Sequence, residues 1–441
     1  MPSLPDIAAR VACAALLVFG AAAPAAELPP STFGPDAPAL APPGPHAVGV
    51  ETLTLVQRAQ VDVLAYDAKT HLAPKRDRVL VVDVWYPARA AAGAARVVYS
   101  GEFPSEPPAP PAHFTVPGIA VRGAPFAGGP YPLVIVSHGY SNAAVAMSWL
   151  TENLASKGYV VAAIHHDDPP ITDTAKFTGP VLRRPLDIAF VAAALQRQLA
   201  AEHWIDPQRT ALVGYSMGGY GVLTDAGAVL DPHGPLAKWV PGGLLLPYCS
   251  GGALESTLRV AHLRAVVAIS PAGGPPWSAW GKNGLAAIRT PLFLINGNRD
   301  ATVGYGRAGL RVFDEAIHAP RYLLTLEEAG HDIGLDPAPR QMRGSLWNLG
   351  WFQDPVWDSA RVNAINAHFI TAFLDFYVKG ERSYAAYLDV PVMNSEQGAW
   401  PNDHAPFAAY SPGSGNITVW KGFQRAFAVG LQLRRAGAAG P

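Results

Sequence analysis

The segment that most constrains the fold of this chain is residues 212–219, where an apolar run ends in the pattern Gly-x-Ser-x-Gly. Residues 210–215 predict a short buried strand and residues 220–229 predict a helix, so Ser216 falls on the turn between them. Glycine is needed on both sides of the serine, because a side chain there would crowd the backbone of a tight turn. The pattern therefore predicts a strained turn that presents a serine hydroxyl. A serine without a catalytic role in a Gly-rich turn would give the same five-residue pattern.

Apolar and helical segments alternate on both sides of this turn. Short apolar runs, typical of parallel strands covered on both faces, occur at residues 133–137, 159–164, 265–269, 291–295 and 322–326. Helical patterns follow at residues 142–157, 184–199, 304–317 and 357–378. Residues 48–57 and 78–86 predict an antiparallel pair of strands before them. This order predicts an α/β fold with right-handed crossovers, in which helices cover both faces of a mostly parallel central sheet.

Residues 1–25 have the form of a secretory signal peptide. An arginine precedes an apolar run at residues 11–23, which ends in the small-x-small form of a cleavage site. The run is too short to span roughly 30 Å of hydrocarbon, and the residues before Cys13 do not fit a lipoprotein cleavage site. We therefore expect export, to the periplasm or beyond, and no transmembrane segment. Cleavage would leave Cys249 as the single cysteine, so we expect no intramolecular disulfide.

The rest of the chain divides into three parts. It has 441 residues, 49% of them hydrophobic, and because α/β folds often exceed the usual ~150 residues per domain, we expect one main domain at residues 46–385. Residues 26–45 are a Pro-rich leader that we expect to be extended and not to pack, and residues 88–130 are expected to form a long surface excursion. The C-terminal extension, residues 386–441, is expected to pack on the domain because it contains Trp400, Trp420 and Phe423.

The charge of the chain excludes one class of partner. There are 33 Lys and Arg against 34 Asp and Glu, a net charge of −1, and 15% of residues are charged against roughly 25% in an average soluble domain. This composition gives no basic surface for phosphate groups, so we expect no nucleic-acid partner. A small neutral or lipid-like molecule fits better. The sequence does not indicate an oligomeric state.

A serine hydroxyl is a weak nucleophile at neutral pH, so it needs a histidine base whose tautomer is fixed by a carboxylate. Asp300 and His331 follow Ser216 in the order Ser, acid, His, and each comes just after a predicted parallel strand. Because the carboxyl ends of parallel strands meet at one edge of a sheet, these three residues are predicted to form a catalytic triad. Asp332, which adjoins the histidine, and Asp225, on the helix after the serine, compete with Asp300 but fit less well by position.

Attack by a serine on a carbonyl also requires two N–H donors for the negative oxygen of the tetrahedral intermediate, each worth about 2.7 to 4 kcal/mol in barrier height. Met217 follows the serine and Tyr140 follows the 133–137 strand, where the backbone N–H groups of such an oxyanion hole belong. His138, two residues before Tyr140, is expected to shape its loop through hydrogen bonds rather than to act as a base.

A metal site is one interpretation of the run His165, His166, Asp167 and Asp168, because His and Asp side chains bind metal ions. Neighbouring residues at the end of a strand point to opposite faces, however, and no spaced partner ligands follow. We therefore expect no metal at these residues. The chemistry of a serine triad also needs no cofactor, and none is expected.

Aromatic residues follow two of the predicted strands. Trp277 and Trp280 lie in the loop after residues 265–269, and both are predicted to line the cleft at the triad. Further aromatic residues that are expected to border this cleft come after His331: Trp347, Trp351, Phe352 and Trp357. For any one of them alone, packing on the core is the more common case. Together they predict an apolar cleft that binds acyl or aryl groups.

Five motifs resemble those of a known family: DVWYP at residues 83–87, SHG at 137–139, GYSMGG at 214–219, GNRD at 297–300 and GH at 330–331. They are similar to bacterial α/β-hydrolases of the dienelactone hydrolase and platelet-activating-factor acetylhydrolase type, over most of residues 46–385. The resemblance implies the α/β-hydrolase fold and a catalytic triad. Dienelactone hydrolases typically have cysteine at the position of Ser216. The acetylhydrolases typically place the acid after the preceding strand, at the position where this chain has Ser270. Because of these two differences, the resemblance implies the substrates of neither family.

These observations favour a hydrolase that cleaves carboxylic esters through an acyl-serine intermediate. An amidase or peptidase with the same triad is a second enzymatic interpretation that the sequence leaves open. A catalytically silent binding protein on a hydrolase scaffold is a third, and the complete triad with both oxyanion donors argues against it.

Overall fold

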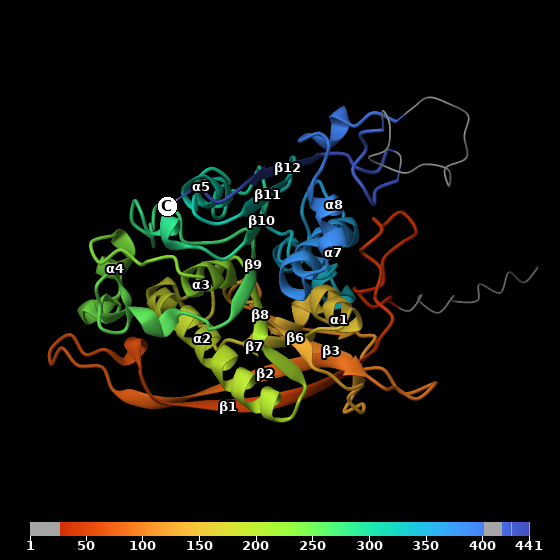
Figure 1. Ribbon diagram of the computed structural model, residues 1–441. Coiled ribbons are helices and arrows are strands. Elements are labelled where there is room, and N and C mark those ends of the chain that lie inside the picture. The colour runs from red at the N-terminus through yellow and green to blue at the C-terminus, as the bar shows by residue number, and fades with distance from the viewer. Residues whose placement is uncertain (1–26, 401–416, 425, 441) are drawn as a thin grey trace, which may run out of the picture.

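A computed structural model describes residues 27–400, 417–424 and 426–440 (Figure 1). The predicted signal peptide therefore lies outside the described residues. A ten-stranded sheet runs through the molecule. In spatial order its strands are β12 (Leu431–Ala436), β11 (Arg321–Leu326), β10 (Leu292–Gly297), β9 (Leu263–Ile269), β8 (Ile205–Tyr215), β6 (Tyr131–Ser137), β7 (Val160–His165), β2 (Lys75–Ala88), β1 (Ala47–Val61) and β5 (Val121–Arg122).

The centre of the sheet is parallel, as predicted. Strands β7, β6, β8, β9, β10 and β11 pair in parallel with their neighbours. Strand β2 joins β7 antiparallel, and β1 pairs antiparallel with β2. The predicted order of an antiparallel start followed by parallel strands is confirmed.

Helices cover both faces of this sheet because side chains alternate along each strand (Figure 1). On β6, Val134 and Val136 join one core with α1 and α7, whereas Leu133 and Ile135 join another with α2 and α3. The helices are α1 (Ser148–Ser156), α2 (Thr178–Ala201), α3 (Met217–Asp225), α4 (Pro235–Trp239), α5 (Gly309–Glu315), α6 (Leu346–Leu349), α7 (Ser359–Leu374) and α8 (Ala385–Leu388). None of the described helices is long and apolar enough to cross a membrane.

The Pro-rich leader packs on the domain, so the expectation that it would not pack is wrong. The Ser31 hydroxyl donates to Glu152 Oε2 at 2.8 Å, and Asn153 Nδ2 donates to Ala41 O at 2.7 Å. Both Ser31 and Ala41 are fully buried. Side chains of α1 hold this segment through its backbone and hydroxyl groups, which hydrophobic periodicity does not record.

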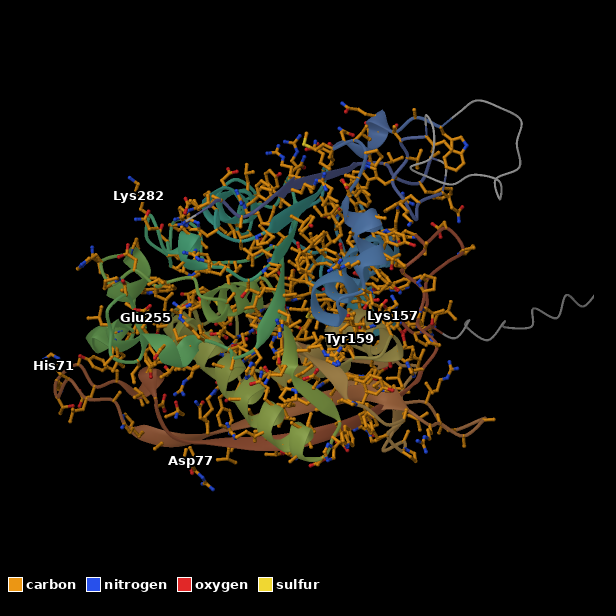
Figure 2. All side chains as sticks on the ribbon, viewed as in Figure 1. His71, Asp77, Lys157, Tyr159, Glu255 and Lys282 are labelled. Carbon is orange, nitrogen blue, oxygen red and sulfur yellow. The ribbon has the colours of Figure 1, made fainter. Side chains whose placement is uncertain are left out.

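Lys157 strengthens the same junction (Figure 2). Its ammonium group donates to Leu40 O at 2.5 Å, to Asn153 Oδ1 at 2.7 Å and to Thr371 Oγ1 at 2.9 Å. Burial lowers the pKa of Lys157 to about 7. The leader is therefore tied to α1 and α7 by buried polar contacts.

Far from this junction, Figure 2 shows His71 and Asp77 at the outer edge of the molecule, on the β1–β2 ribbon.

Residues 88–130, expected to be a surface excursion, instead contain a hairpin of β3 (Val98–Phe103) and β4 (Ala112–Pro117). Tyr99, Phe103 and Phe114 are buried in the core on the α1 side of the sheet. These side chains alternate with exposed positions, so the hairpin has one apolar face. The expectation was wrong because the Pro- and Gly-rich flanks obscured this short alternation.

The C-terminal extension packs on the domain through β12 and two buried aromatic side chains, as predicted. Strand β12 pairs antiparallel with β11 and closes that edge of the sheet. Trp420 and Phe423 are buried against Phe369 of α7, with ring centroids 5.8 and 5.9 Å from it. Residues 401–416 lie outside the described part.

Candidate active site

Ser216 lies on a sharp turn between β8 and α3. Its φ of 54° and ψ of −113° are values that side-chain-bearing residues rarely adopt. A Cβ at position 214 would lie 2.3 Å from Gly218 O, and one at position 218 would lie 1.9 Å from Ser137 O. Glycine is therefore required at both positions, and the turn has the strained form predicted from the Gly-x-Ser-x-Gly pattern.

The structure brings the three predicted triad residues together. His331 Nε2 lies 3.0 Å from Ser216 Oγ, and His331 Nδ1 lies 2.8 Å from Asp300 Oδ2. The other carboxylate oxygen of Asp300 accepts hydrogen bonds from the backbone N–H groups of Thr302 at 2.9 Å and Val303 at 3.0 Å. Burial opposes ionisation of Asp300, but the hydrogen bonds from His331 and these amides outweigh it and lower its pKa. Asp300 is thus held as a carboxylate that orients His331.

Neither competing acid contacts a ring nitrogen of His331. Asp332 lies 3.5 Å from the Tyr215 hydroxyl, and burial raises its pKa to about 6. Asp225 is buried within α3, and its carboxyl oxygens have no hydrogen-bond partner among the described residues. Burial raises its pKa well above the usual value of a carboxyl group. The geometry favours Asp300 as the acid.

Tyr140 and Met217 line the same cleft as Ser216 and His331. Met217 is the first residue of α3, where backbone N–H groups have no partner within the helix. Neither the Tyr140 nor the Met217 N–H group donates a hydrogen bond to any described residue. Both groups are therefore free to bind an oxyanion beside the serine.

The cleft has a volume of about 760 Å³ and two aromatic walls. The Phe177 ring contacts both Trp277 and Trp239, with ring centroids 4.6 and 5.2 Å away. On the other wall, the indole N–H groups of Trp347 and Trp351 both donate to Pro104 O, at 2.9 and 3.1 Å. Among the described residues, no Lys or Arg lines the cleft.

Phe177 and Trp239 were missed from the sequence. Phe177 precedes the segment in which a helix was predicted, and Trp239 lies in a stretch for which neither a helix nor a strand was predicted. A signal was available, because aromatic residues in loops at the carboxyl ends of parallel strands are candidates for a binding cleft.

The predicted place of Trp280 in the cleft is wrong. Trp280 is 2% exposed, and its indole N–H donates to Thr224 Oγ1 of α3 at 3.2 Å. Phe352 is fully buried against Phe103, and the Trp357 indole donates to Glu327 O, so neither of these lines the cleft. The spacing of residues within an irregular loop does not determine which side chains turn outward.

The His165 to Asp168 run is distributed among different partners. His165 Nε2 lies 2.7 Å from Asp83 Oδ2, and His166 Nδ1 lies 3.0 Å from Asp187 Oδ2. Asp168 pairs with Arg184. The part of the chain that the structure describes contains no group of three His, Cys, Asp or Glu side chains arranged to hold a metal ion.

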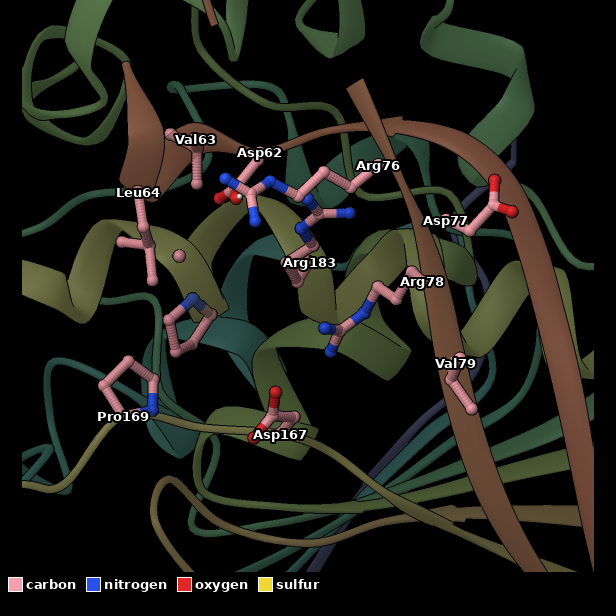
Figure 3. A pocket seen from close by; sticks show the side chains of 12 residues that line it. Asp62, Val63, Leu64, Arg76, Asp77, Arg78, Val79, Asp167, Pro169 and Arg183 are labelled. Atoms are coloured by element: carbon pink, nitrogen blue, oxygen red, sulfur yellow. Dashed lines mark ion pairs between the residues drawn. The ribbon is translucent and has the colours of Figure 1, made fainter. Parts of the chain in front are cut away.

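A second pocket, of about 450 Å³, lies between the β1–β2 ribbon and the start of α2 (Figure 3). Three arginines line it. Arg78 makes two hydrogen bonds to Asp187, at 2.6 and 2.7 Å, Arg76 pairs with Asp62 at 3.2 Å, and Arg183 donates to Val61 O. No triad residue lines this pocket, so it is separate from the catalytic cleft.

Comparisons with known proteins give matches to parts of this chain. A family model described as PET hydrolase-like matches residues 124–241, which contain Ser216 and both candidate oxyanion residues. Cutinase est2 of Thermobifida alba and cutinase 2 of Thermobifida cellulosilytica are 32% identical over 111 residues, which are 25% of this chain and 35% and 40% of those proteins. The match thus spans well under two thirds of these relatives.

The solved structure of a ferulic acid esterase from Streptomyces cinnamoneus aligns with a TM-score of 0.50 and 21% identity, over 76% of this chain and 91% of the esterase. This likeness and the sheet topology confirm the α/β-hydrolase fold. The resemblance to bacterial α/β-hydrolases is also confirmed.

Proposed function

We propose that this protein is a serine hydrolase that cleaves carboxylic esters through an acyl-serine intermediate. The observation that carries the proposal is the hydrogen-bonded chain from Ser216 through His331 to Asp300, which opens into an aromatic cleft. The names of the relatives support an ester substrate, since they are cutinases, a PET hydrolase-like family and a ferulic acid esterase.

In the proposed mechanism, His331 Nε2 takes the proton of Ser216 as the serine oxygen attacks the ester carbonyl carbon. The N–H groups of Tyr140 and Met217 stabilise the resulting oxyanion. The imidazolium then donates its proton to the leaving alcohol oxygen, and the C–O bond breaks to leave an acyl-serine. Water, deprotonated by His331, attacks the acyl carbon, and the bond between that carbon and Ser216 Oγ breaks. Ser216 Oγ takes the proton back from His331 and the carboxylic acid is released. These steps use no metal and no cofactor.

The lining of the cleft suggests neutral substrates with apolar acyl or aryl groups. Aromatic rings form both walls, and the acidic side chain of Asp332 lines the cleft without a Lys or Arg side chain among the described lining residues. An anionic substrate would be repelled once Asp332 is ionised. Hydrolysis of a chain-length series of p-nitrophenyl esters, run beside a p-nitroanilide, tests ester against amide preference.

Labelling by a fluorophosphonate tests the identity of the nucleophile. The reagent should modify Ser216 alone, because hydrogen bonding to His331 makes this serine reactive. Ser216→Ala should lose both labelling and ester hydrolysis while keeping the circular dichroism spectrum of the wild type. Labelling that persists in Ser216→Ala would refute the assignment.

Trp277 and Trp280 provide a matched pair for the proposed acyl site. Trp277→Ala should raise KM for p-nitrophenyl benzoate about threefold to tenfold more than for p-nitrophenyl acetate, because an aromatic contact is lost. Trp280→Ala should instead lower the free energy of unfolding by about 3 to 5 kcal/mol, since its ring is buried. Steady-state kinetics and urea unfolding of both variants measure these effects. Equal KM changes for the two esters in Trp277→Ala would argue against an aryl site.

We also propose that the protein is exported, on the evidence of residues 1–25. Mass spectrometry of the mature protein from its native source should find an N-terminus near residue 26. An intact N-terminus in the mature protein would contradict the proposal.

A further inference from the structure

The peptide that joins Gly139 to Tyr140 would supply one of the two oxyanion donors in the proposed mechanism. A peptide is planar and trans, so its N–H group points away from its own C=O group. Whatever holds the carbonyl oxygen of Gly139 therefore sets the direction of the Tyr140 N–H group.

Two buried side chains bond that carbonyl oxygen, and the backbone N–H of Asn142 lies 3.4 Å from it. Arg184 Nη2 donates to Gly139 O at 3.0 Å, and His138 Nδ1 lies 2.6 Å from the same atom. The other terminal nitrogen of Arg184 donates to His138 O, the preceding carbonyl. The guanidinium group thus donates hydrogen bonds to two successive carbonyl groups of the loop. Its rigid, planar set of N–H donors allows this arrangement, whereas a lysine ammonium group would not.

Ser141, which follows Tyr140, is held by Asp168, the ion-pair partner of Arg184. Asp168 forms an ion pair with Arg184 and accepts a hydrogen bond from the Ser141 N–H at 3.0 Å. Ser141 has a φ of 57°, a left-handed conformation that side-chain-bearing residues rarely adopt. Tyr140 is therefore fixed between two constrained neighbours, and the Arg184 and Asp168 pair contributes to both constraints.

The position of this pair also argues for a role beyond folding. The Arg184 side chain is fully buried and that of Asp168 is 5% exposed. Burying two charges costs desolvation free energy, which their attraction does not generally exceed. A well-packed apolar pair would serve stability equally, but it could not bind the two carbonyl groups.

We propose that Arg184, held by Asp168, is a positioning residue that aims the Tyr140 N–H group at the oxyanion. This inference rests on the proposed ester hydrolase function. Arg184 acts through the Gly139–Tyr140 peptide and does not touch the substrate. His138 contributes the second hydrogen bond to the same carbonyl and works in the same direction.

The test compares Arg184→Lys with Arg183→Lys in the full chain. Arg183 is the adjacent residue of α2, but its side chain lines the second pocket (Figure 3) and donates to Val61 O instead of to the oxyanion loop. Active sites are counted by fluorophosphonate labelling, and kcat and KM per labelled site are measured with a neutral p-nitrophenyl ester. Inhibition by a trifluoromethyl ketone, which forms an oxyanion on Ser216, is compared with inhibition by the corresponding unreactive ether.

Arg184→Lys should lower kcat per labelled site about 100-fold, as for the loss of one oxyanion donor, with KM nearly unchanged. Affinity for the trifluoromethyl ketone should fall by a similar factor, whereas affinity for the ether should not change. Arg183→Lys should match the wild type in all four quantities. A merely structural role for Arg184 would reduce the number of labelled sites and leave kcat per site unchanged, and that result would overturn the inference.

Asp168→Asn gives a second variant if Arg184→Lys does not fold. It retains an acceptor for the Ser141 N–H but loses the ion pair, so kcat per labelled site should fall by about tenfold or more. Wild-type kcat per site in Asp168→Asn would also overturn the inference. A wild-type protein that neither hydrolyses esters nor labels at Ser216 would instead refute the proposed function, so the two failures are distinguishable.

Discussion

The imidazole ring of His331 lies between the Asp300 carboxylate and the Ser216 hydroxyl. The next residue in the chain, Asp332, is a second acid. Asp300 Oδ2 accepts from His331 Nδ1 at 2.8 Å, whereas Asp332 faces the Tyr215 hydroxyl. The two acids also differ in pKa, because at Asp300 hydrogen bonds outweigh burial and lower the pKa, whereas at Asp332 burial raises the pKa to about 6. Only one of them is placed to select the tautomer of His331 that leaves Nε2 free to accept the serine proton.

Asp300→Asn and Asp332→Asn should therefore behave differently. Asp300→Asn should lower kcat by roughly 10⁴-fold, because an amide can stabilise the tautomer of His331 in which Nε2 already carries a proton. The equivalent substitution in a serine protease has an effect of about this size. Asp332→Asn should keep kcat within about tenfold of the wild type for a neutral ester. Steady-state kinetics and circular dichroism of both variants provide the measurement. The opposite ranking of the two variants would move the acid to Asp332.

At the residue scale, much of the site could be predicted from the sequence. Ser216, Asp300 and His331 were identified because chain order and position after a strand constrain a triad strongly, and both constraints are visible in the sequence. The separation of Trp277 from Trp280 was not predictable, because the two lie in one irregular loop without a period that fixes side-chain direction. The role of Arg184 was equally hidden, since its partners are backbone atoms distant in sequence.

Among the elements, those with long apolar runs were predictable and those held by polar contacts were not. The six parallel strands are buried on both faces, which produces an uninterrupted apolar run in each. The leader is instead anchored by Glu152, Asn153 and Lys157, which bind its backbone and one hydroxyl group. A Pro-rich composition is typical both of a free linker and of a segment that packs in extended form.

The packing of the leader can be tested with a pair of equivalent substitutions. Ala41 is fully buried, and Ala92 lies exposed in a loop. Ala41→Asp should lower the free energy of unfolding by about 3 kcal/mol, because it buries a carboxylate without a partner. Ala92→Asp should change it by less than about 0.5 kcal/mol. Urea unfolding monitored by tryptophan fluorescence measures both, and equal stability of the two variants would contradict a packed leader.

For the molecule as a whole, pH should affect stability through buried carboxyl groups. Burial raises the pKa of Glu152, Asp225 and Asp336, and that of Asp336 reaches about 7. Asp336 accepts hydrogen bonds from the Trp149 N–H and the Ser148 hydroxyl, both at 2.8 Å, and so ties the loop after His331 to the start of α1. The folded protein therefore keeps a proton on Asp336 over a pH range in which the unfolded chain has lost it.

The sign of the effect follows from this difference in bound protons. A carboxyl group whose pKa is raised on folding contributes its full stabilisation at pH values below the unfolded pKa, near 3.8, and loses it as pH rises to the folded pKa of about 7. Asp336→Asn removes the titration but keeps an oxygen for the Trp149 N–H. From pH 5 to pH 8 the wild type should lose roughly 2 to 3 kcal/mol of stability relative to Asp336→Asn. Urea unfolding of both proteins at the two pH values measures this difference. Parallel pH profiles would show that Asp336 is ionised in the folded protein at pH 5, and that the contact between the His331 loop and α1 is made by a carboxylate.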